Sequence, residues 1–160
     1  MLLSVDDEIC LRPISLSDTN VIVRWRNFDA VRLNMQDQRI LTVEQHRNYY
    51  LSQILSGKIK QYIISKDGVN FGCVYYKRYA TYVEIGVFIG EKQYRGKGFA
   101  KKALQQLFSI IRNDGINTDY ILTVKRTNIR AINLYKHLGF IFYKVLDNRD
   151  FILMKKENEI

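Results

Sequence analysis

The stretch Tyr82–Leu107, YVEIGVFIGEKQYRGKGFAKKALQQL, contains a strand, a glycine loop and a helix in direct succession. Residues 82–90 alternate in character and are rich in β-branched and aromatic side chains, as in a β-strand. Residues 93–98 (QYRGKG) break this pattern, and apolar residues then recur at helical spacing from Phe99 to Ile111. The order of these three elements is the starting point for assigning a fold.

A glycine loop that leads into a helix N-terminus is suited to binding phosphate. Backbone N–H groups converge there, and the helix dipole adds a partial positive charge. Arg95, Lys97, Lys101 and Lys102 add full charges. The spacing is neither that of the Walker loop nor that of the dinucleotide fingerprint with its acidic residue downstream. The alternative is a solvated turn that needs glycine for a positive φ.

Length and composition predict one globular domain that spans residues 1–160. Of the residues, 47% are hydrophobic and 12% aromatic, which is typical of a chain with a buried core. The N-terminus, MLLSVDDEIC, is acidic where a signal peptide is basic, and no apolar run reaches the roughly 18 residues of a membrane span. Cys10 and Cys73 are too few for a disulfide framework, and no metal-ligand spacing is present. We therefore expect a cytoplasmic protein without a metal or a membrane partner.

The net charge is +9, from 25 lysine and arginine residues against 16 acidic residues. An excess of this size favours polyanionic partners. Nucleic acid, a coenzyme A-type cofactor and a nucleotide-linked substrate all fit, and charge alone does not separate them.

Apolar periodicity and turn residues predict the remaining elements. After Gly57 the pattern is typical of an antiparallel meander, and the strand after the long helix is expected to run parallel to its predecessor through a crossover. Helix starts are indicated by Ser17 and Asp18, by Thr42 and by Asn128. We expect strands at 9–14, 60–65, 70–79, 82–90, 120–124, 141–145 and 151–155, and helices at 19–27, 30–35, 42–57, 99–111 and 129–137.

Two motifs resemble those of the GNAT family of acetyl-CoA-dependent N-acetyltransferases. Gln93, Gly96 and Gly98 match the pattern Gln/Arg-x-x-Gly-x-Gly/Ala of its pyrophosphate loop. Residues 128–140, NIRAINLYKHLGF, match its second cofactor motif, Asn-x-x-Ala-x-x-x-Tyr-x-x-x-Gly-Phe. The motifs occur in the family's order and are separated by one strand, and the resemblance covers about residues 70–140.

The resemblance implies an α/β fold with a mixed, mostly antiparallel sheet flanked by helices. The sheet is expected to splay between residues 82–89 and 120–124, with acetyl-CoA in the opening. The main chain of Val87, Phe88 and Ile89 would pair with the pantetheine amides. Lys97, Lys125 or Arg130 would meet the 3′-phosphate. The resemblance assigns the other cofactor contacts to the glycine loop, the first residues of its helix and the second motif: Gln93, Arg95, Gly96, Lys97, Gly98, Phe99, Ala100, Asn128, Ala131 and Tyr135.

The reaction implied by the resemblance is direct attack of a substrate amine on the thioester. The N–H near Ile89 is the expected oxyanion donor. Tyr135 matches the family's proton donor to the departing thiolate, and a pKa near 10 keeps a tyrosine protonated at pH 7; the alternative is a core residue. Glu84 is a candidate base through water or a partner of Lys77 or Arg78. His46 is a second candidate base, or a substrate-binding or surface residue.

The N-terminal half is expected to bind the acceptor. Trp25-Arg26-Asn27, Arg32, Met35 and His46 resemble a GNAT branch that includes the UDP-4-amino-sugar N-acetyltransferases of pseudaminic acid biosynthesis. Arginine binds phosphate in bidentate fashion, and aromatic rings can stack on a uracil or a sugar. The candidate substrate-binding residues are therefore Trp25, Arg26, Asn27, Met35, His46 and Tyr49.

Three alternatives are kept beside the amino-sugar hypothesis. Trp25 and Met35 can be core residues, and Arg26 can form a structural salt bridge. The acceptor can be a protein N-terminus, as in acetyltransferases of ribosomal proteins. A non-enzymatic nucleic-acid-binding module would explain the basic charge but neither motif, so no nucleic acid partner is expected. The sequence leaves open whether the chain forms a homodimer.

Overall fold

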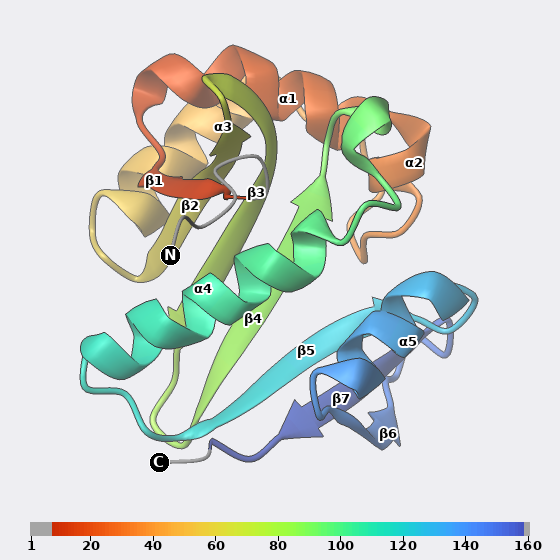
Figure 1. The fold of residues 1–160 in the computed structure, drawn as a ribbon. Coiled ribbons are helices and arrows are strands. Elements are labelled where there is room, and N and C mark those ends of the chain that lie inside the picture. Colours follow the sequence, from red (N-terminus) through yellow and green to blue (C-terminus); the bar gives the residue numbers. More distant parts are fainter. Residues whose placement is uncertain (1–7, 159–160) are drawn as a thin grey trace.

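The computed structural model describes residues 8–158, which form a seven-stranded sheet in the order β1-β2-β3-β4-β5-β7-β6 (Figure 1). Only the pair β4–β5 is parallel, and the other neighbouring strands are antiparallel. The predicted mixed, mostly antiparallel sheet is therefore confirmed. The strands are β1 Cys10–Pro13, β2 Ile59–Lys66, β3 Val69–Arg78, β4 Tyr82–Ile89, β5 Asp119–Lys125, β6 Ile141–Val145 and β7 Phe151–Lys156.

The helices follow the predicted order with local differences. The helix expected at 42–57 is α3 followed by a π-helical segment, and the helix expected at 30–35 is one turn that begins at Asp29. The two short 3₁₀ segments, η2 and η4, were not predicted. The helices are η2 Leu16–Asp18, α1 Thr19–Asn27, α2 Asp29–Arg32, α3 Val43–Tyr49, η3 Tyr50–Ile54, η4 Lys92–Tyr94, α4 Phe99–Asn113 and α5 Ile129–His137.

Capping explains where several helices begin. Thr42 and Gln45 form the capping box expected at α3, with N–H to side-chain distances of 3.1 and 2.9 Å. Asp18 does not cap α1 with its side chain, contrary to the prediction. Its carboxylate instead accepts hydrogen bonds from the Ser15 N–H, at 2.8 Å, and from both terminal nitrogens of Arg12, at 2.9 Å. This carboxylate therefore ties the chain before α1 to β1.

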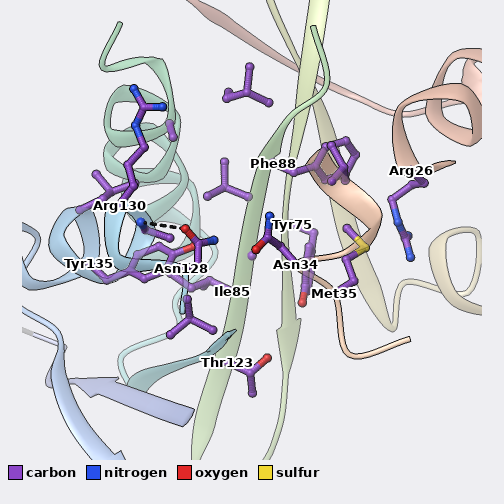
Figure 2. A pocket seen from close by; sticks show the side chains of 18 of the residues that line it. Arg26, Asn34, Met35, Tyr75, Ile85, Phe88, Thr123, Asn128, Arg130 and Tyr135 are labelled. Atoms are coloured by element: carbon purple, nitrogen blue, oxygen red, sulfur yellow. Dashed lines mark hydrogen bonds between the residues drawn. The ribbon is translucent and has the colours of Figure 1, made fainter. Parts of the chain in front are cut away.

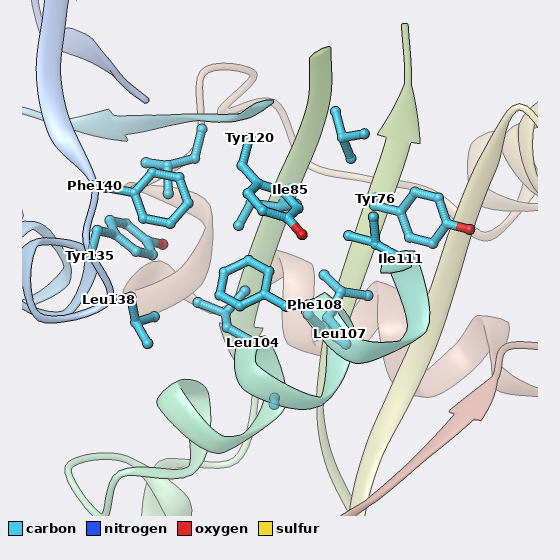
Figure 3. Packing of buried hydrophobic residues seen from close by; sticks show 14 of the residues in the cluster. Tyr76, Ile85, Leu104, Leu107, Phe108, Ile111, Tyr120, Tyr135, Leu138 and Phe140 are labelled. Carbon is cyan, nitrogen blue, oxygen red and sulfur yellow. The ribbon is translucent and has the colours of Figure 1, made fainter. Parts of the chain in front are cut away.

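Helices cover both faces of the sheet. The larger core lies on the side of α4 and α5, where buried residues of α4 pack on β3, β4 and β5 (Figure 3). The smaller core lies on the opposite side, where Trp25 and Ile22 of α1 pack on Ile63 of β2 and Cys73 of β3. Alternate residues of one strand face opposite sides of a sheet, so Ile63 and Ile64 belong to different cores.

Strands β4 and β5 separate after a short parallel contact. They pair only at Tyr82–Asp119, Val83–Tyr120 and Glu84–Ile121. Beyond Glu84, strand β4 continues to Ile89 and keeps its pairing with β3, but it has no register partner on β5. The predicted splay is thus present in the sheet, and Figure 1 shows the two strands diverging.

No helix in the described residues 8–158 is long and apolar enough to cross a membrane. Helix α4, for example, buries Leu104, Leu107 and Ile111 on one side and exposes Lys101, Gln105 and Arg112 on the other.

We predict that Leu107→Ala destabilises the protein, because Leu107 of α4 has no exposed surface. Removing a fully buried leucine side chain leaves a cavity and costs about 2–5 kcal/mol. Urea unfolding followed by circular dichroism measures the free energy of unfolding. The control is Gln105→Ala on the exposed side of the same helix, which should change stability by no more than about 0.5 kcal/mol. Equal effects of the two substitutions would contradict the assigned packing of α4.

Candidate active site

A cavity of about 890 Å³ lies in the opening between β4 and β5 (Figure 2). Its walls come from β4, from the loop before α4, from the first turns of α4 and α5, and from the segment around α2. Figure 2 shows Asn128 and Tyr135 on one side, and Arg26 and Met35 on the other. The cavity therefore connects the two motif regions with the N-terminal half.

The open edge of β4 forms one wall. Val87, Phe88 and Ile89 line the cavity, and the separation from β5 leaves the main chain of this segment without a strand partner on that side. Backbone N–H and C=O groups need hydrogen-bond partners. An extended ligand with amide groups can supply them in the manner of an added strand.

The glycine loop forms the end of the cavity next to α4. Gly96 and Gly98 have φ angles of +74° and +81°, a conformation that favours glycine. Gly98 is the N-cap of α4 and offers no side-chain cap, so the first N–H groups of α4 need an external partner. Arg95 donates from Nε to the Ile89 carbonyl and from Nη2 to the Gly90 carbonyl, each at 3.0 Å. The Arg95 side chain thereby fixes the loop to the end of β4.

Other predicted loop residues differ in their positions. Gly98, Phe99 and Ala100 line the cavity, whereas Gln93 and Lys97 are exposed and do not. Among the residues proposed for a 3′-phosphate, Arg130 lines the cavity and lies so close to Gly96 that a Cβ there would overlap its guanidinium. Lys125 instead donates to the Leu33 carbonyl at 2.8 Å.

Helix α5 brings the second motif to the cavity. Asn128 is its N-cap, as predicted, and its Oδ1 accepts a hydrogen bond from the Ala131 N–H at 3.3 Å. Asn128, Ala131 and Tyr135 all line the cavity. Tyr135 is only 8% exposed and packs edge-on against Phe140, at 6.1 Å between ring centroids. Burial raises the pKa of Tyr135 to about 12, so its hydroxyl keeps its proton at neutral pH.

Glu84 lies at the point where the strands separate. It lines the cavity and is half-buried, and burial raises its pKa while the nearby Lys77 opposes this shift. Glu84 and Lys77 are register partners across β3 and β4. A carboxylate with a raised pKa next to a cavity can accept a proton from a bound group.

Two tyrosines, Tyr49 and Tyr75, lie near Glu84, and the sequence predicted only Tyr49 as a site residue. Tyr49 was a candidate and lines the cavity, and burial raises its pKa to about 12. Tyr75 was missed; burial raises its pKa, with Glu84 and Tyr49 adding to the shift. Its ring occupies the space a side chain at Gly86 would need. The Tyr75 ring lies over Gly86 because the two residues are cross-strand partners. Hydrophobic periodicity does not show which residues pair across strands, so it does not indicate Tyr75.

Arg26 is the prominent cation at the far side of the cavity. It lines the cavity together with Met35 and Asn34 (Figure 2). Its Nε is buried and has no hydrogen-bond partner among the described residues. The salt bridges of residues 8–158 do not include Arg26, so the structure does not support the alternative of a structural ion pair.

Trp25 and Asn27 do not line the cavity, contrary to the expectation for substrate-binding residues. Trp25 has no exposed surface; its indole packs on Gly90, and its Nε1 donates to Glu91 at 2.7 Å. Asn27 holds Leu41 through two hydrogen bonds, of 2.8 and 2.7 Å. Both side chains therefore stabilise the structure around the site and do not contact a ligand in the cavity, because helix α1 turns them toward the protein interior.

His46 is also absent from the cavity lining and is not a surface residue. It is 2% exposed, and its Nδ1 lies 3.1 Å from Thr19 Oγ1. Burial lowers its pKa, with the Arg26 charge acting in the same direction. The imidazole in this position joins α3 to α1 and does not line the cavity.

The described residues contain no group of three or more His, Cys, Asp or Glu side chains that could hold a metal ion. The titratable side chains that line the cavity include Glu84, Tyr49, Tyr75 and Tyr135.

Comparisons with known proteins agree with this architecture. The model of the acetyltransferase (GNAT) family matches residues 27–140. A domain from Methanocaldococcus jannaschii is 23% identical, with 92% of this chain and 97% of that chain covered and a TM-score of 0.82. A putative acetyltransferase from Salmonella typhimurium, solved with acetyl-CoA, is 20% identical, with 94% of both chains covered and a TM-score of 0.75. An aminoglycoside acetyltransferase in complex with coenzyme A is 18% identical, with 94% and 95% covered and a TM-score of 0.79.

We predict that Glu84→Gln stabilises the protein increasingly as pH rises. Burial raises the pKa of Glu84 in the folded state. Folding therefore favours the protonated form, and this contribution to stability is lost as pH rises from about 4, the ordinary glutamate value, through the raised pKa. The difference in free energy of unfolding between variant and wild type should be larger at pH 7 than at pH 4. Urea titrations at both pH values measure it. The exposed Glu157→Gln is the control, and a pH-independent difference at Glu84 would contradict the assigned burial.

Proposed function

This chain belongs to the acetyltransferase (GNAT) family, and from that premise we propose that it acetylates the 4-amino group of a UDP-linked amino sugar. The observation that carries the proposal is the balance of charge in the part of the cavity lined by Arg26, Met35 and Tyr49, which we call the acceptor end. Arg26 and Lys77 line the cavity together with Glu84, which is the register partner of Lys77. Asp37, the other acidic lining residue, is held by Arg39 through hydrogen bonds of 2.9 and 2.8 Å.

Acetyl-CoA supplies the acetyl group as a thioester, and the residues present fit it. The unpaired edge of β4 at Val87–Ile89 suits an amide-containing arm. The Gly96–Gly98 loop and the uncapped start of α4 suit a pyrophosphate. Arg130, next to Gly96, adds a full positive charge at the same end.

The chain's own residues can meet the three requirements of acetyl transfer to an amine. Glu84, with its raised pKa, takes a proton from the attacking amine, directly or through water. The N–H groups at the open edge of β4 donate to the oxygen that gains charge. Tyr135, which is protonated at neutral pH, gives its proton to the departing sulfur. A sugar amine beside electron-withdrawing oxygens is less basic than lysine, so a weak base suffices.

An anionic acceptor fits the far end of the cavity better than a polycationic one. The unpaired Nε of Arg26 lies buried in the wall, and a guanidinium binds phosphate with two parallel hydrogen bonds. Tyr49 and Met35 line the same region and offer apolar surface to a ring. The second candidate, a protein N-terminus, would be favoured by an acidic groove, which these residues do not form.

We expect Tyr135→Phe to lower kcat by roughly 100-fold, the usual lower range for loss of a general acid. The affinity for acetyl-CoA should stay unchanged, because phenylalanine keeps the packing of the ring on Phe140. Steady-state kinetics give kcat, and calorimetric titration gives the affinity. The matched control is Tyr143→Phe on the exposed strand β6. Unchanged turnover of Tyr135→Phe would remove the hydroxyl from the reaction.

The proposed acceptor class is tested by titrating the acetyl-CoA-loaded enzyme with UDP and with UDP-sugars in a calorimeter. We expect UDP to bind and Arg26→Ala to weaken it at least about tenfold, the effect of losing a hydrogen bond to a charged group. Arg26→Lys should give an intermediate affinity, because it keeps the charge but loses the bidentate geometry. Arg47→Ala, an exposed arginine of α3, is the control.

Each outcome of this titration has a defined meaning. Binding of acetyl-CoA without binding of UDP would overturn the nucleotide-sugar acceptor and direct the search to peptide amines, with the family assignment intact. Absence of acetyl-CoA binding would overturn the assignment of the cavity itself.

A further inference from the structure

Tyr75 lines the cavity but is neither the base nor the acid of the proposed reaction. Figure 2 shows it between Asn128 on one side and Met35 on the other. Tyr75 of β3 is the register partner of Gly86 of β4, and a Cβ built on Gly86 would lie 2.9 Å from the Tyr75 hydroxyl oxygen. The hydroxyl therefore lies over the backbone of β4, in the segment that has no partner on β5.

Tyr75 shares a face of the sheet with Glu84. Antiparallel register partners lie on the same face, and so do alternate residues of one strand. On β3, Tyr75 lies two residues before Lys77, which is the register partner of Glu84. Two residues before Tyr75, Cys73 belongs to the smaller core beneath α1. Tyr75 and Glu84 therefore reach the cavity from the side of the sheet on which the N-terminal half packs.

Three titratable side chains from three elements lie near the Tyr75 hydroxyl. Burial is the main reason that the pKa of Tyr75 is raised, and the charges of Glu84, Tyr49 and Tyr135 add to this shift. No hydrogen bond to a described residue contributes to it. The hydroxyl thus keeps its proton at neutral pH, and both its donor and its acceptor capacity are available to a bound molecule or to water.

The geometry of amine attack requires more than a base. A neutral primary amine has one lone pair and two N–H groups. The lone pair must point at the thioester carbon, so acceptors for the N–H groups fix its direction. The Glu84 carboxylate is one acceptor, and the oxygen of a tyrosine hydroxyl can also accept. Same-face positions on a strand are roughly 6.6 Å apart, and two hydrogen bonds of about 3 Å span a similar distance.

We propose that Tyr75 is a substrate-positioning residue, whose hydroxyl oxygen accepts a hydrogen bond from the attacking amine while Glu84 accepts its other N–H. As the C–N bond forms, the amine gives one proton to Glu84. As the C–S bond breaks, the sulfur takes the proton of Tyr135. Tyr75 exchanges no proton. This role rests on the proposed acetylation of an amine, but not on a nucleotide-linked acceptor.

Tyr75→Phe tests the role, because it keeps the ring over Gly86 and removes the acceptor oxygen. The probes are a UDP-linked 4-amino sugar and hydroxylamine, a neutral amine too small to need the rest of the acceptor end. We expect kcat to fall roughly tenfold with each amine that the wild type acetylates, the effect of one lost hydrogen bond. The calorimetric affinity for acetyl-CoA should stay unchanged. The control is Tyr62→Phe on β2, which does not line the cavity.

Gly86→Ala tests the position of the hydroxyl while the tyrosine is kept. The added Cβ would overlap the Tyr75 ring and displace it. We expect kcat to fall at least as far as in Tyr75→Phe, and by a clearly smaller factor when Gly86→Ala is added to Tyr75→Phe, because residues that act through one contact are not additive. Urea unfolding shows that each variant is folded under the assay conditions.

Each contrary result has its own meaning. An unchanged kcat of folded Tyr75→Phe, or an equal fall in Tyr62→Phe, would overturn the positioning role and leave amine acetylation intact. Equal factors for Gly86→Ala in both backgrounds would overturn the assigned position of the hydroxyl. Acetyl-CoA binding without acetylation of either amine by the wild type would overturn the proposed acetylation itself, and the role of Tyr75 with it.

Discussion

The separation of β4 from β5 is the constraint on which the rest of the site depends. The two strands share only three register pairs, and beyond Glu84 the edge of β4 faces a cavity instead of a strand. Unpaired main-chain groups in a sheet are costly unless something completes them. A ligand with amide groups can do so, and the same opening gives the second motif access to that ligand.

Packing on the α1 side of the sheet fixes the conformation of the chain at the opening between β4 and β5. Trp25 is buried against Gly90, and the carboxylate of Glu91 accepts hydrogen bonds from Trp25 Nε1 and Arg24, each at 2.7 Å. Arg95 returns to the carbonyls of Ile89 and Gly90. The chain between β4 and α4 is thus fixed from two sides before any ligand binds. A glycine at position 90 is needed because a side chain there would overlap the indole.

Several basic side chains gather around the main cavity. The main cavity combines Arg26, Arg95 and Arg130 with the helix N-terminus of α4, while Glu84 provides a titratable carboxylate at the point where β4 and β5 separate. Part of the net charge of +9 therefore lies where an anionic ligand can bind.

From the sequence by itself, local patterns predicted the order of strands and helices, the glycine loop and the cap of the second motif, and the resemblance of the two motifs to the GNAT family implied the mixed, mostly antiparallel sheet. Alternation, helical spacing and capping residues placed β4, α4 and α5 close to their observed bounds, and Gly96, Gly98 and Asn128 have the local roles that their types favour. Tertiary structure alone decided which side chains reach the cavity. Trp25 and Asn27 share helix α1 with Arg26, yet of these three only Arg26 lines the cavity, and His46 of α3 does not line it either. Tyr75 entered the site through its cross-strand pairing with Gly86. Residue spacing determines which side chains share a face of a helix or strand. Packing between elements that are distant in sequence determines whether that face contacts the core, another element or the cavity.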